Sequence, residues 1–584
     1  MKMSIRNKDM KYLLGLDFGT ESVRVYIVNQ EGEEISSYVH EYSRFAEGLF
    51  CDAKEKRFRQ HPLDYQEGLE LAVKKALREA AAKEHDRNIG QKVVGIGVDT
   101  TGSTPCPVDI NGTPLALSTD FKDDPNAMFH LWKDHTATEE AALINDVAHG
   151  KTDKWKGIDY TSFSGTVYSS EWFWSKILHT LKHSDQGFRD AAYSWVEHCD
   201  WITRMLTGNT KPETMMRGRT ASGHKAMWNE LWQGLPSEEF LVAVDPLLAG
   251  LRQRLYTDTY TSDKPVGKLS PEWAQKLGLN EDAVVAVGSF DAHMGAVGAG
   301  IKKGTLVKIM GTSTCDMMIA PYDLMRPQGQ ETLIEGICGQ VDGSITPGYI
   351  GLEAGQSAVG DVFAWFRNLL IEGARIGLRE EGIRRLGKQR LENLKTAIYQ
   401  EMARKGKKLD VMDSAIPLVL DWLNGRRTPY ANQELTGAMW NVALGTDAPR
   451  FFRGLVEGTA YGSKMIVDQF KRYDLSVEEV NACGGLSRIP YVAQITSDVM
   501  GVPIRVARSG QTCALGATMF AAVAAGLYPD IQTAQRRMSS GFLRTYRPNM
   551  DNHALYTQLF EQYKEGGRSL EPLMLTMNKL RRTA

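Results

Sequence analysis

Cysteine is scarce in this sequence, and the few cysteines present are spread along it. The 584 residues contain seven cysteines, and no two of them form a CxxC pair. No histidine lies at metal-ligand spacing from a cysteine, apart from the adjacent His198 and Cys199. We therefore expect neither a structural zinc site nor a disulfide framework.

The sequence also lacks an excess of charge and any long apolar run. The formal net charge is -2, so the chain has no field of the kind that draws a protein to nucleic acid. No stretch stays apolar for the roughly 18 residues of a membrane span, and the polar first residues lack the apolar core of a signal peptide. We expect a cytoplasmic protein with small-molecule partners and no nucleic-acid or membrane partner.

Two common nucleotide-binding motifs are absent. No GxxxxGK[ST] string occurs, which argues against a P-loop site. The glycines of GAVGAG at 295–300 have the wrong spacing for a dinucleotide fingerprint, which argues against a Rossmann dehydrogenase. Any nucleotide site in this chain must be built from other elements.

The first 100 residues show a clear order of predicted elements. Residues 11–17, 22–28 and 34–42 have the apolar or alternating patterns of three strands, which we expect to form an antiparallel meander. An amphipathic helix follows Pro62, a favourable residue for the first turn. Residues 93–100, VVGIGVDT, are typical of a buried strand.

Similar elements return later in the chain, which is too long for one hydrophobic core. Residues 305–322 repeat the pattern of strand, glycine turn and strand, and residues 448–473 and 512–528 are predicted helices. We therefore predict two mixed α/β halves that meet near 290–303, where flexible glycines occur. The predicted domains are residues 1–295 and 296–584, and the second includes a charged, solvated helix pair at about 371–408 to which we assign no chemistry.

Two turns rich in glycine and hydroxyl side chains, one in each half, predict a nucleotide site between the halves. They lie in GLDFGTESVR (15–24) and GTST (311–314). Free backbone N–H groups and hydroxyls can bind phosphate oxygens, and a carboxylate such as Asp17 suits a magnesium ion. The first turn alone is weak evidence, since an ordinary hairpin would have the same residues, but the repeat favours phosphate binding. The predicted contacts in the first turn are Gly19, Thr20, Ser22 and Arg24.

The strings GLDFGT, GTST and ACGGLSR, in this order, resemble those of the FGGY carbohydrate kinases, a branch of the actin and heat-shock ATPase superfamily. The similarity covers nearly the whole chain and implies two ribonuclease-H-like domains that close over magnesium ATP and a sugar in the cleft between them. Further strings, among them LWKDHTA (131–137) and GSFDAHMG (288–295), are similar to those of family members that act on ribulose.

The resemblance also implies roles for individual residues. Asp291 is the expected general base, a role that suits a carboxylate within reach of the attacking alcohol; the alternative is a helix N-cap aspartate. For ATP, the resemblance implies contacts at Gly311, Thr312, Ser313 and Gly355, with Gly484 and Gly485 against the adenosine. For the sugar it implies contacts at Cys106, Trp132, Asp134, Tyr168, Lys225, Asp291 and Glu353.

Read in isolation, several of these side chains have simpler explanations. Trp132 fits a core tryptophan, Lys225 a surface lysine and Glu353 a helix-cap glutamate. One departure from the wider family concerns the sugar. Glycerol kinases have an Arg-Glu pair where this chain has Gly102 and Ser103, which argues against glycerol as the substrate.

The expected activity is the transfer of the γ-phosphoryl group of ATP to the C5 hydroxyl of L-ribulose, which gives L-ribulose 5-phosphate and ADP in L-arabinose catabolism. One alternative is a kinase for another ketopentose or pentitol, such as xylulose, since epimers differ only in the direction of one hydroxyl. Another is an actin-like or chaperone-like ATPase that binds a protein partner. A homodimer is the expected assembly.

Overall fold

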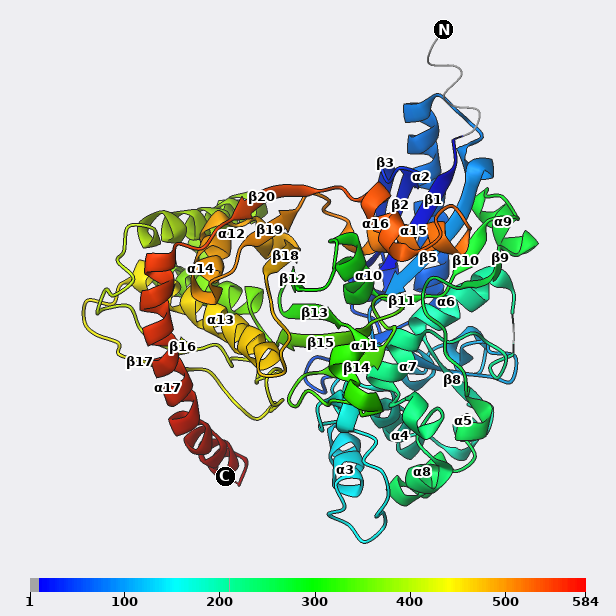
Figure 1. Ribbon diagram of the computed structural model, residues 1–584, viewed down its shortest axis with the longest axis horizontal. Helices are drawn as coiled ribbons and strands as arrows, with labels where there is room; N and C mark the ends of the chain where they lie inside the picture. Colours follow the sequence, from blue (N-terminus) through cyan, green and yellow to red (C-terminus); the bar gives the residue numbers. More distant parts are fainter. Residues whose placement is uncertain (1–9, 210, 584) are drawn as a thin grey trace.

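The computed structural model describes residues 10–209 and 211–583, and its core is a pair of seven-stranded sheets (Figure 1). The first sheet has the strand order β3-β2-β1-β5-β10-β9, with β11 also paired to β5, and the second has the order β14-β15-β13-β12-β18-β19-β20. The strands of the first sheet are β1 (Tyr12–Phe18), β2 (Ser22–Asn29), β3 (Glu34–Glu41), β5 (Val93–Thr100), β9 (Pro265–Lys268), β10 (Val284–Ala286) and β11 (Ser289–Phe290). Those of the second are β12 (Thr305–Met310), β13 (Thr314–Ala320), β14 (Gly339–Asp342), β15 (Ile350–Gln356), β18 (Glu479–Cys483), β19 (Ile504–Ala507) and β20 (Phe542–Tyr546).

The two sheets share one arrangement of strands. In the first, β1, β2 and β3 are antiparallel, and β5 and β10 continue the sheet parallel to β1. In the second, β12, β13 and β15 are antiparallel, and β18 and β19 continue parallel to β12. This repeat confirms the predicted α/β fold with two related cores, as well as the predicted meander at the start of the chain.

The main helices follow from local sequence signals. The helix α2 begins at Pro62, and the side chain of His61 accepts a hydrogen bond from the N–H of Leu63 at its start. The start of α13 is capped in the same way by Asp447, which accepts from the N–H of Arg450. The longer helices are α2 (Pro62–Glu84), α3 (Thr138–Ala148), α4 (Phe173–Lys182), α6 (His198–Thr207), α12 (Gly360–Gly406), α13 (Ala448–Lys471), α14 (Pro490–Met500), α15 (Thr512–Ala524) and α17 (Met550–Thr583).

Helices α15 and α10 (Asp291–Gly298) pack tightly between the two sheets (Figure 1). A Cβ added to Gly97 on β5 would lie 2.0 Å from the carbonyl oxygen of Ala517, and one on Gly298 would lie 2.0 Å from that of Thr512. The small residues of both helices therefore permit close backbone contact. The predicted boundary at 295/296 falls inside α10, which contains Gly295 and Gly298, whereas Gly300 and Gly304 follow the helix. The division into two domains at this point stays a prediction.

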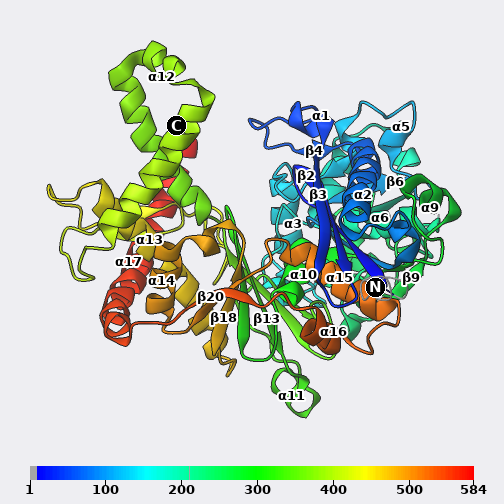
Figure 2. The same cartoon turned by 90° about the horizontal axis from the view of Figure 1, so that it is seen from above.

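The charged segment predicted at about 371–408 is helical as far as Gly406 and forms the outer part of α12. Gly387 has a φ of 71°, which interrupts the regular helical backbone. In Figure 2 the helix stands out from the second sheet and folds back on itself. This arm lies away from the centre of the molecule, which agrees with a solvated segment.

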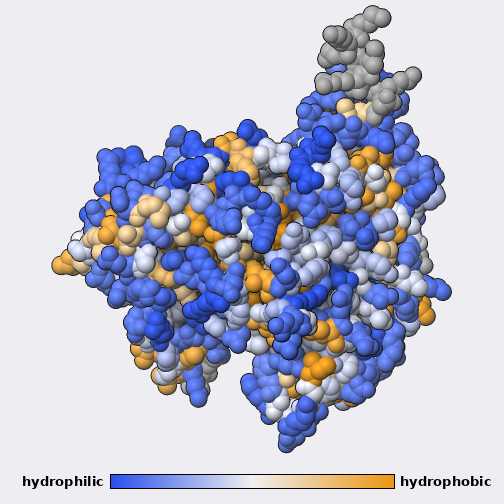
Figure 3. Space-filling model, viewed as in Figure 1, coloured by the Kyte–Doolittle hydropathy of each residue, from blue (hydrophilic) through white to orange (hydrophobic). Residues whose placement is uncertain are grey.

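In the view of Figure 3 most of the surface is hydrophilic, and hydrophobic side chains appear in small scattered groups. Among the described residues, no helix has the length and apolar character needed to cross a bilayer.

Candidate active site

A cavity of 610 Å³ opens between the two sheets, and both halves of the chain line it. Helices α3 and α7 (Arg219–Lys225), the start of α10, the turn between β12 and β13, and strand β15 all contribute to its wall. Of the sequence-predicted residues, the cavity brings together Thr20, Trp132, Tyr168, Lys225, Asp291, Gly311, Thr312, Ser313 and Glu353.

Three acidic residues meet at the edge of the first sheet. The parallel pairing of β1 and β5 places Asp17 opposite Asp99, and β11 places Ser289 opposite Asp99, two residues before Asp291. Asp17 accepts a hydrogen bond of 2.5 Å from Arg24. Asp99 is fully buried, and neither of its carboxylate oxygens has a hydrogen-bond partner among the described residues. Burial, and next the charges of Asp17 and Asp291, raise the pKa of Asp99 well above its usual value.

This donor set fits a divalent cation. A buried carboxylate without a donor beside two other carboxylates is costly unless positive charge compensates it, and hard cations such as Mg²⁺ prefer oxygen ligands. Asp17 and Asp99 are the residues that would hold the ion, directly or through water. Sequence reasoning missed Asp99, although GVDT (97–100) repeats the Gly-x-Asp of GLDFGT (15–20) at the end of a second strand.

Asp291 is the first residue of α10 and faces the cavity. Its carboxylate accepts a hydrogen bond of 2.6 Å from the N–H of Ala292, while the N-cap position itself is Phe290. Burial, followed by the charge of Asp17, raises the pKa of Asp291 to about 7. A carboxylate with this pKa can accept a proton near neutral pH, as a general base must.

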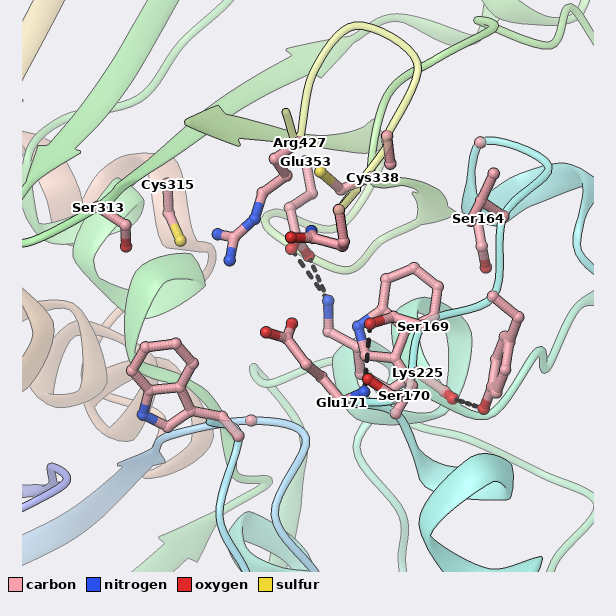
Figure 4. A pocket seen from close by; sticks show the side chains of 18 of the residues that line it. Ser164, Ser169, Ser170, Glu171, Lys225, Ser313, Cys315, Cys338, Glu353 and Arg427 are labelled. Carbon is pink, nitrogen blue, oxygen red and sulfur yellow. Dashed lines mark hydrogen bonds and ion pairs between the residues drawn. The ribbon is translucent and has the colours of Figure 1, made fainter. Parts of the chain in front are cut away.

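Lys225 and Glu353 form an ion pair that joins the two halves across the cavity (Figure 4). The Lys225 Nζ lies 3.0 and 3.1 Å from the two Glu353 carboxylate oxygens. Two buried imidazoles stand behind the pair, with His224 Nδ1 at 3.4 Å and His293 Nε2 at 4.0 Å from Glu353. Burial alone would raise the pKa of Glu353, but the charge of Lys225, which also donates hydrogen bonds to the carboxylate, outweighs it and lowers that pKa.

The two histidines stay neutral at physiological pH. Burial lowers the pKa of His293 to about 4 and that of His224 well below its usual value. The Lys225–Glu353 pair therefore presents one cation and one anion toward the cavity. Such a pair offers both donors and acceptors to the hydroxyls of a polyol.

Trp132 and Tyr168 line the cavity with their rings, while their polar atoms bind the protein. Trp132 Nε1 donates a hydrogen bond of 3.0 Å to Thr20 Oγ1, which ties the wall of the cavity to the first glycine turn. The Tyr168 hydroxyl donates a hydrogen bond of 2.5 Å to the carbonyl oxygen of Lys225 and accepts one of 3.0 Å from the N–H of Trp174. Tyr168 therefore helps to position Lys225.

Backbone hydrogen bonds fix the second turn, residues 311–313, which lines the cavity. The N–H of Gly311 donates to the carbonyl oxygen of Ser313 at 2.9 Å. The carbonyl oxygen of Thr312 accepts from the N–H groups of Val359 and Asp361 at 2.8 and 3.2 Å. The hydroxyl-bearing residues Thr312 and Ser313 thus line the cavity on a fixed backbone.

Comparison with known proteins identifies the family. The N-terminal domain of the FGGY family of carbohydrate kinases matches residues 12–298, and the C-terminal domain of the same family matches residues 306–525. The chain belongs to the FGGY family of carbohydrate kinases. Family membership confirms the resemblance seen in the sequence and argues against a chaperone-type ATPase.

Individual FGGY relatives are similar along their whole length. A ribulokinase of Vibrio parahaemolyticus is 46% identical over 574 residues, which cover 98% of both chains. A ribulokinase of Shouchella clausii is 35% identical, again over 98% of both chains. Among solved structures, a xyloylose kinase from Brucella ovis superposes with a TM-score of 0.75 at 18% identity, covering 96% of this chain and 100% of that one. This last likeness concerns the fold alone.

Two predicted sugar contacts of this FGGY kinase lie away from the cavity. Asp134 is fully buried, forms an ion pair with Arg59 and accepts a hydrogen bond of 2.7 Å from the N–H of Phe58. Cys106 is fully buried in the core of the first sheet, and its thiol lies 3.4 Å from the carbonyl oxygen of Pro107. Other protein groups enclose both side chains, and their contact with a sugar stays a prediction.

Some of the residues predicted to bind ATP line the cavity, and others do not. From the first turn, only Thr20 lines the cavity; the lining does not include Gly19, Ser22 or Arg24. The N–H of Gly19 donates a hydrogen bond to the carbonyl oxygen of Ser22. Gly355, Gly484 and Gly485 are also outside the lining of the cavity. Gly484 has a φ of 86°, and a Cβ there would lie 2.5 Å from the carbonyl oxygen of Met310, so its backbone requires glycine. Their contact with ATP stays a prediction.

Proposed function

We propose that this FGGY kinase is a ribulokinase, which transfers the γ-phosphoryl group of ATP to the C5 hydroxyl of L-ribulose. The products are L-ribulose 5-phosphate and ADP, a step of L-arabinose catabolism. One observation carries the proposal: Asp291, whose pKa is about 7, faces a cavity that also holds the Lys225–Glu353 pair and the 311–313 turn. The likeness to ribulokinases over 98% of the chain supports the choice of sugar.

In this mechanism Asp291 accepts the proton of the attacking hydroxyl. The bond between that oxygen and the γ-phosphorus forms as the bond to the bridging oxygen of ADP breaks. Lys225 and Glu353 orient the sugar through its other hydroxyls, and the ring of Trp132 packs against its carbon atoms. A magnesium ion held by Asp17 and Asp99 would neutralise phosphate charge when bound.

The nucleotide would lie between the two glycine turns. Thr20 from the first half and Thr312 and Ser313 from the second line the same cavity, so both halves can donate to the phosphates. Because these turns belong to different sheets, we expect ATP and sugar together to draw the halves closer than either ligand alone.

A panel of sugars tests the proposal. ADP release is measured with L-ribulose, D-ribulose, both xyluloses, ribitol and no sugar. We expect the highest kcat/KM with L-ribulose and little ADP release without sugar. A higher kcat/KM for a xylulose would replace the proposed substrate, and sugar-independent ATP hydrolysis at the same rate would contradict a sugar kinase. Location in the cytoplasm and assembly as a homodimer remain predictions.

A further inference from the structure

Arg427 is an arginine of the cavity wall that the sequence did not single out. It lies in the loop between β16 (Leu418–Leu420) and β17 (Ala438–Trp440). Within residues 10–209 and 211–583, no side chain or backbone group forms a hydrogen bond or ion pair with its guanidinium. Its neighbour Arg426 differs, because it binds Glu571 with two hydrogen bonds of 2.8 and 3.1 Å.

The residue that follows Arg427 is anchored to strand β15 through its side chain. Thr428 Oγ1 accepts a hydrogen bond of 3.2 Å from the N–H of Gly355, and it lies 3.3 Å from Cys338 Sγ. The Cδ atom of Arg427 lies 3.6 Å from the position that a Cβ of Gly355 would take. The aliphatic part of Arg427 therefore rests on β15 next to Gly355, which leaves room for it.

This placement aims the guanidinium at the centre of the cavity. Cys315 pairs with Gly355 across the β13–β15 ladder and lies two residues after Ser313, the last residue of the 311–313 turn. Figure 4 shows the Arg427 guanidinium pointing into the cavity between Cys315 and Glu353. The charge of Arg427 thus lies between the turn proposed to bind phosphates and the pair proposed to bind the sugar.

No carboxylate of the cavity neutralises Arg427 directly. Glu353 is already paired with Lys225. Glu171 lines the same cavity, with His135 Nε2 at 3.6 Å, but forms no ion pair with Arg427 among the described residues. Burial lowers the pKa of Arg427, but the negative charges of Glu171 and Glu353 raise it, so the guanidinium stays charged. A fixed, charged and unpartnered guanidinium in a cleft is suited to an anionic ligand, and its planar fork matches phosphate oxygens.

We propose that Arg427 is a catalytic residue that binds the phosphoryl group as it passes from ATP to the sugar, and then the phosphate of the product. The proposal rests on the proposed kinase function. Arg427 forms no covalent bond: it donates N–H hydrogen bonds to the phosphoryl oxygens while the sugar oxygen replaces ADP at phosphorus and Asp291 takes the proton. Charge on the transferring group is spread over these oxygens, so hydrogen bonds to them lower the barrier.

The test compares Arg427→Ala and Arg427→Lys with Arg426→Ala, a matched arginine outside the cavity. Loss of a guanidinium at the transferring phosphoryl group costs about 10³-fold or more in kcat, so we expect at least about 10² for Arg427→Ala and a smaller loss for Arg427→Lys. Arg426→Ala should stay within about twofold. Millimolar guanidinium should partly restore Arg427→Ala.

Calorimetric binding separates a phosphate contact from a sugar contact. We expect Arg427→Ala to bind L-ribulose within about twofold of the wild type, but L-ribulose 5-phosphate at least tenfold more weakly. Equal loss for both ligands, or a kcat near that of Arg426→Ala, would overturn the role assigned to Arg427. If Arg427→Ala unfolds, the same comparison with Arg427→Lys decides.

A separate assay of the wild type shows whether L-ribulose is the substrate, independently of the Arg427 variants. The wild type is assayed first with the sugar panel, and whichever sugar it phosphorylates best replaces ribulose in the Arg427 experiments. A wild type that phosphorylates no sugar contradicts the proposed function, whereas an active wild type with unimpaired Arg427 variants contradicts only the inference about Arg427.

Discussion

Asp17 and Asp99 lie opposite each other on the parallel strands β1 and β5, and only Asp17 has a hydrogen-bond donor among the described residues. Burial raises the pKa of Asp99, and repulsion between the two carboxylates on adjacent strands raises it further. Proteins keep such pairs where a cation compensates the charge. The arrangement therefore accounts for the acid beside the first glycine turn better than a hairpin alone.

Asp99→Asn and Asp17→Asn should each shift the magnesium concentration needed for half-maximal activity upward, because an amide oxygen is a poorer ligand for a hard dication than a carboxylate. In magnesium-free buffer, Asp99→Asn should also raise the melting temperature increasingly as pH rises above the usual range of an aspartate, because the raised pKa of Asp99 costs the wild type stability there. Asp123→Asn, on an exposed loop, is the control. An unchanged magnesium dependence in both variants would remove these residues from the metal site.

The activity of the wild type should rise with pH through about 7, where Asp291 loses its proton and becomes a base. The same pKa has a consequence for stability. Its value in the folded state lies above the ordinary 3.8, so the folded state holds the extra proton between these values and stability falls as pH rises from about 4 to 7. A pH profile of kcat measures the first effect, and the melting temperatures of the wild type and Asp291→Asn across the same pH range measure the second. A difference between the two melting temperatures that does not change with pH would contradict the raised pKa of Asp291.

Glu353→Gln should destabilise the protein by about 3 kcal/mol, because it leaves the buried ammonium of Lys225 without its partner. The pKa of Glu353 is lowered in the folded state, so the stabilisation is present above its unfolded pKa and is lost as pH falls below that value. Urea unfolding of Glu353→Gln and of Lys225→Met/Glu353→Gln, compared at neutral and acid pH, measures this. The double variant should recover part of the lost free energy of unfolding. If the single and the double variant lost the same free energy, Lys225 and Glu353 would not be a coupled pair.

Trp132 should show two separable contributions. Trp132→Ala removes the ring and should raise the KM for the sugar about tenfold or more, the effect of losing much of an apolar wall. Trp132→Phe keeps a ring but loses the hydrogen bond to Thr20, so it should change the KM for ATP more than that for the sugar. Steady-state kinetics with both substrates distinguishes the variants. If both substitutions changed the two constants equally, Trp132 would belong to the general core.

The sequence predicted much of the fold, because its periodicity is local. The meander at 11–42, the helix after Pro62 and the small-residue helix at 512–528 all correspond to observed elements. The position of that last helix was not predictable. It comes from the second half of the chain but packs on the first sheet, which glycines such as Gly97 permit.

The site was predictable only where a string of neighbouring residues carries it. Asp291 and the 311–313 turn lie in such strings. Lys225 and Glu353 were each predicted as sugar contacts, but their ion pair was not, because they are 128 positions apart and meet only in the fold. Asp134 lies in a distinctive string, yet it is enclosed by Arg59 and Phe58. Arg427 had no signal in its own sequence, since its position depends on the way its loop rests on β15.

The kcat of Asp291→Asn for L-ribulose-dependent ADP release tests the central claim most directly. The substitution keeps the size of the side chain but removes the basic carboxylate, so kcat should fall by about 10² or more, the scale of general-base catalysis. Binding of ATP and L-ribulose should persist, and added magnesium should not restore activity. A kcat near that of the wild type, or its recovery with magnesium, would contradict the assignment of Asp291 as the base.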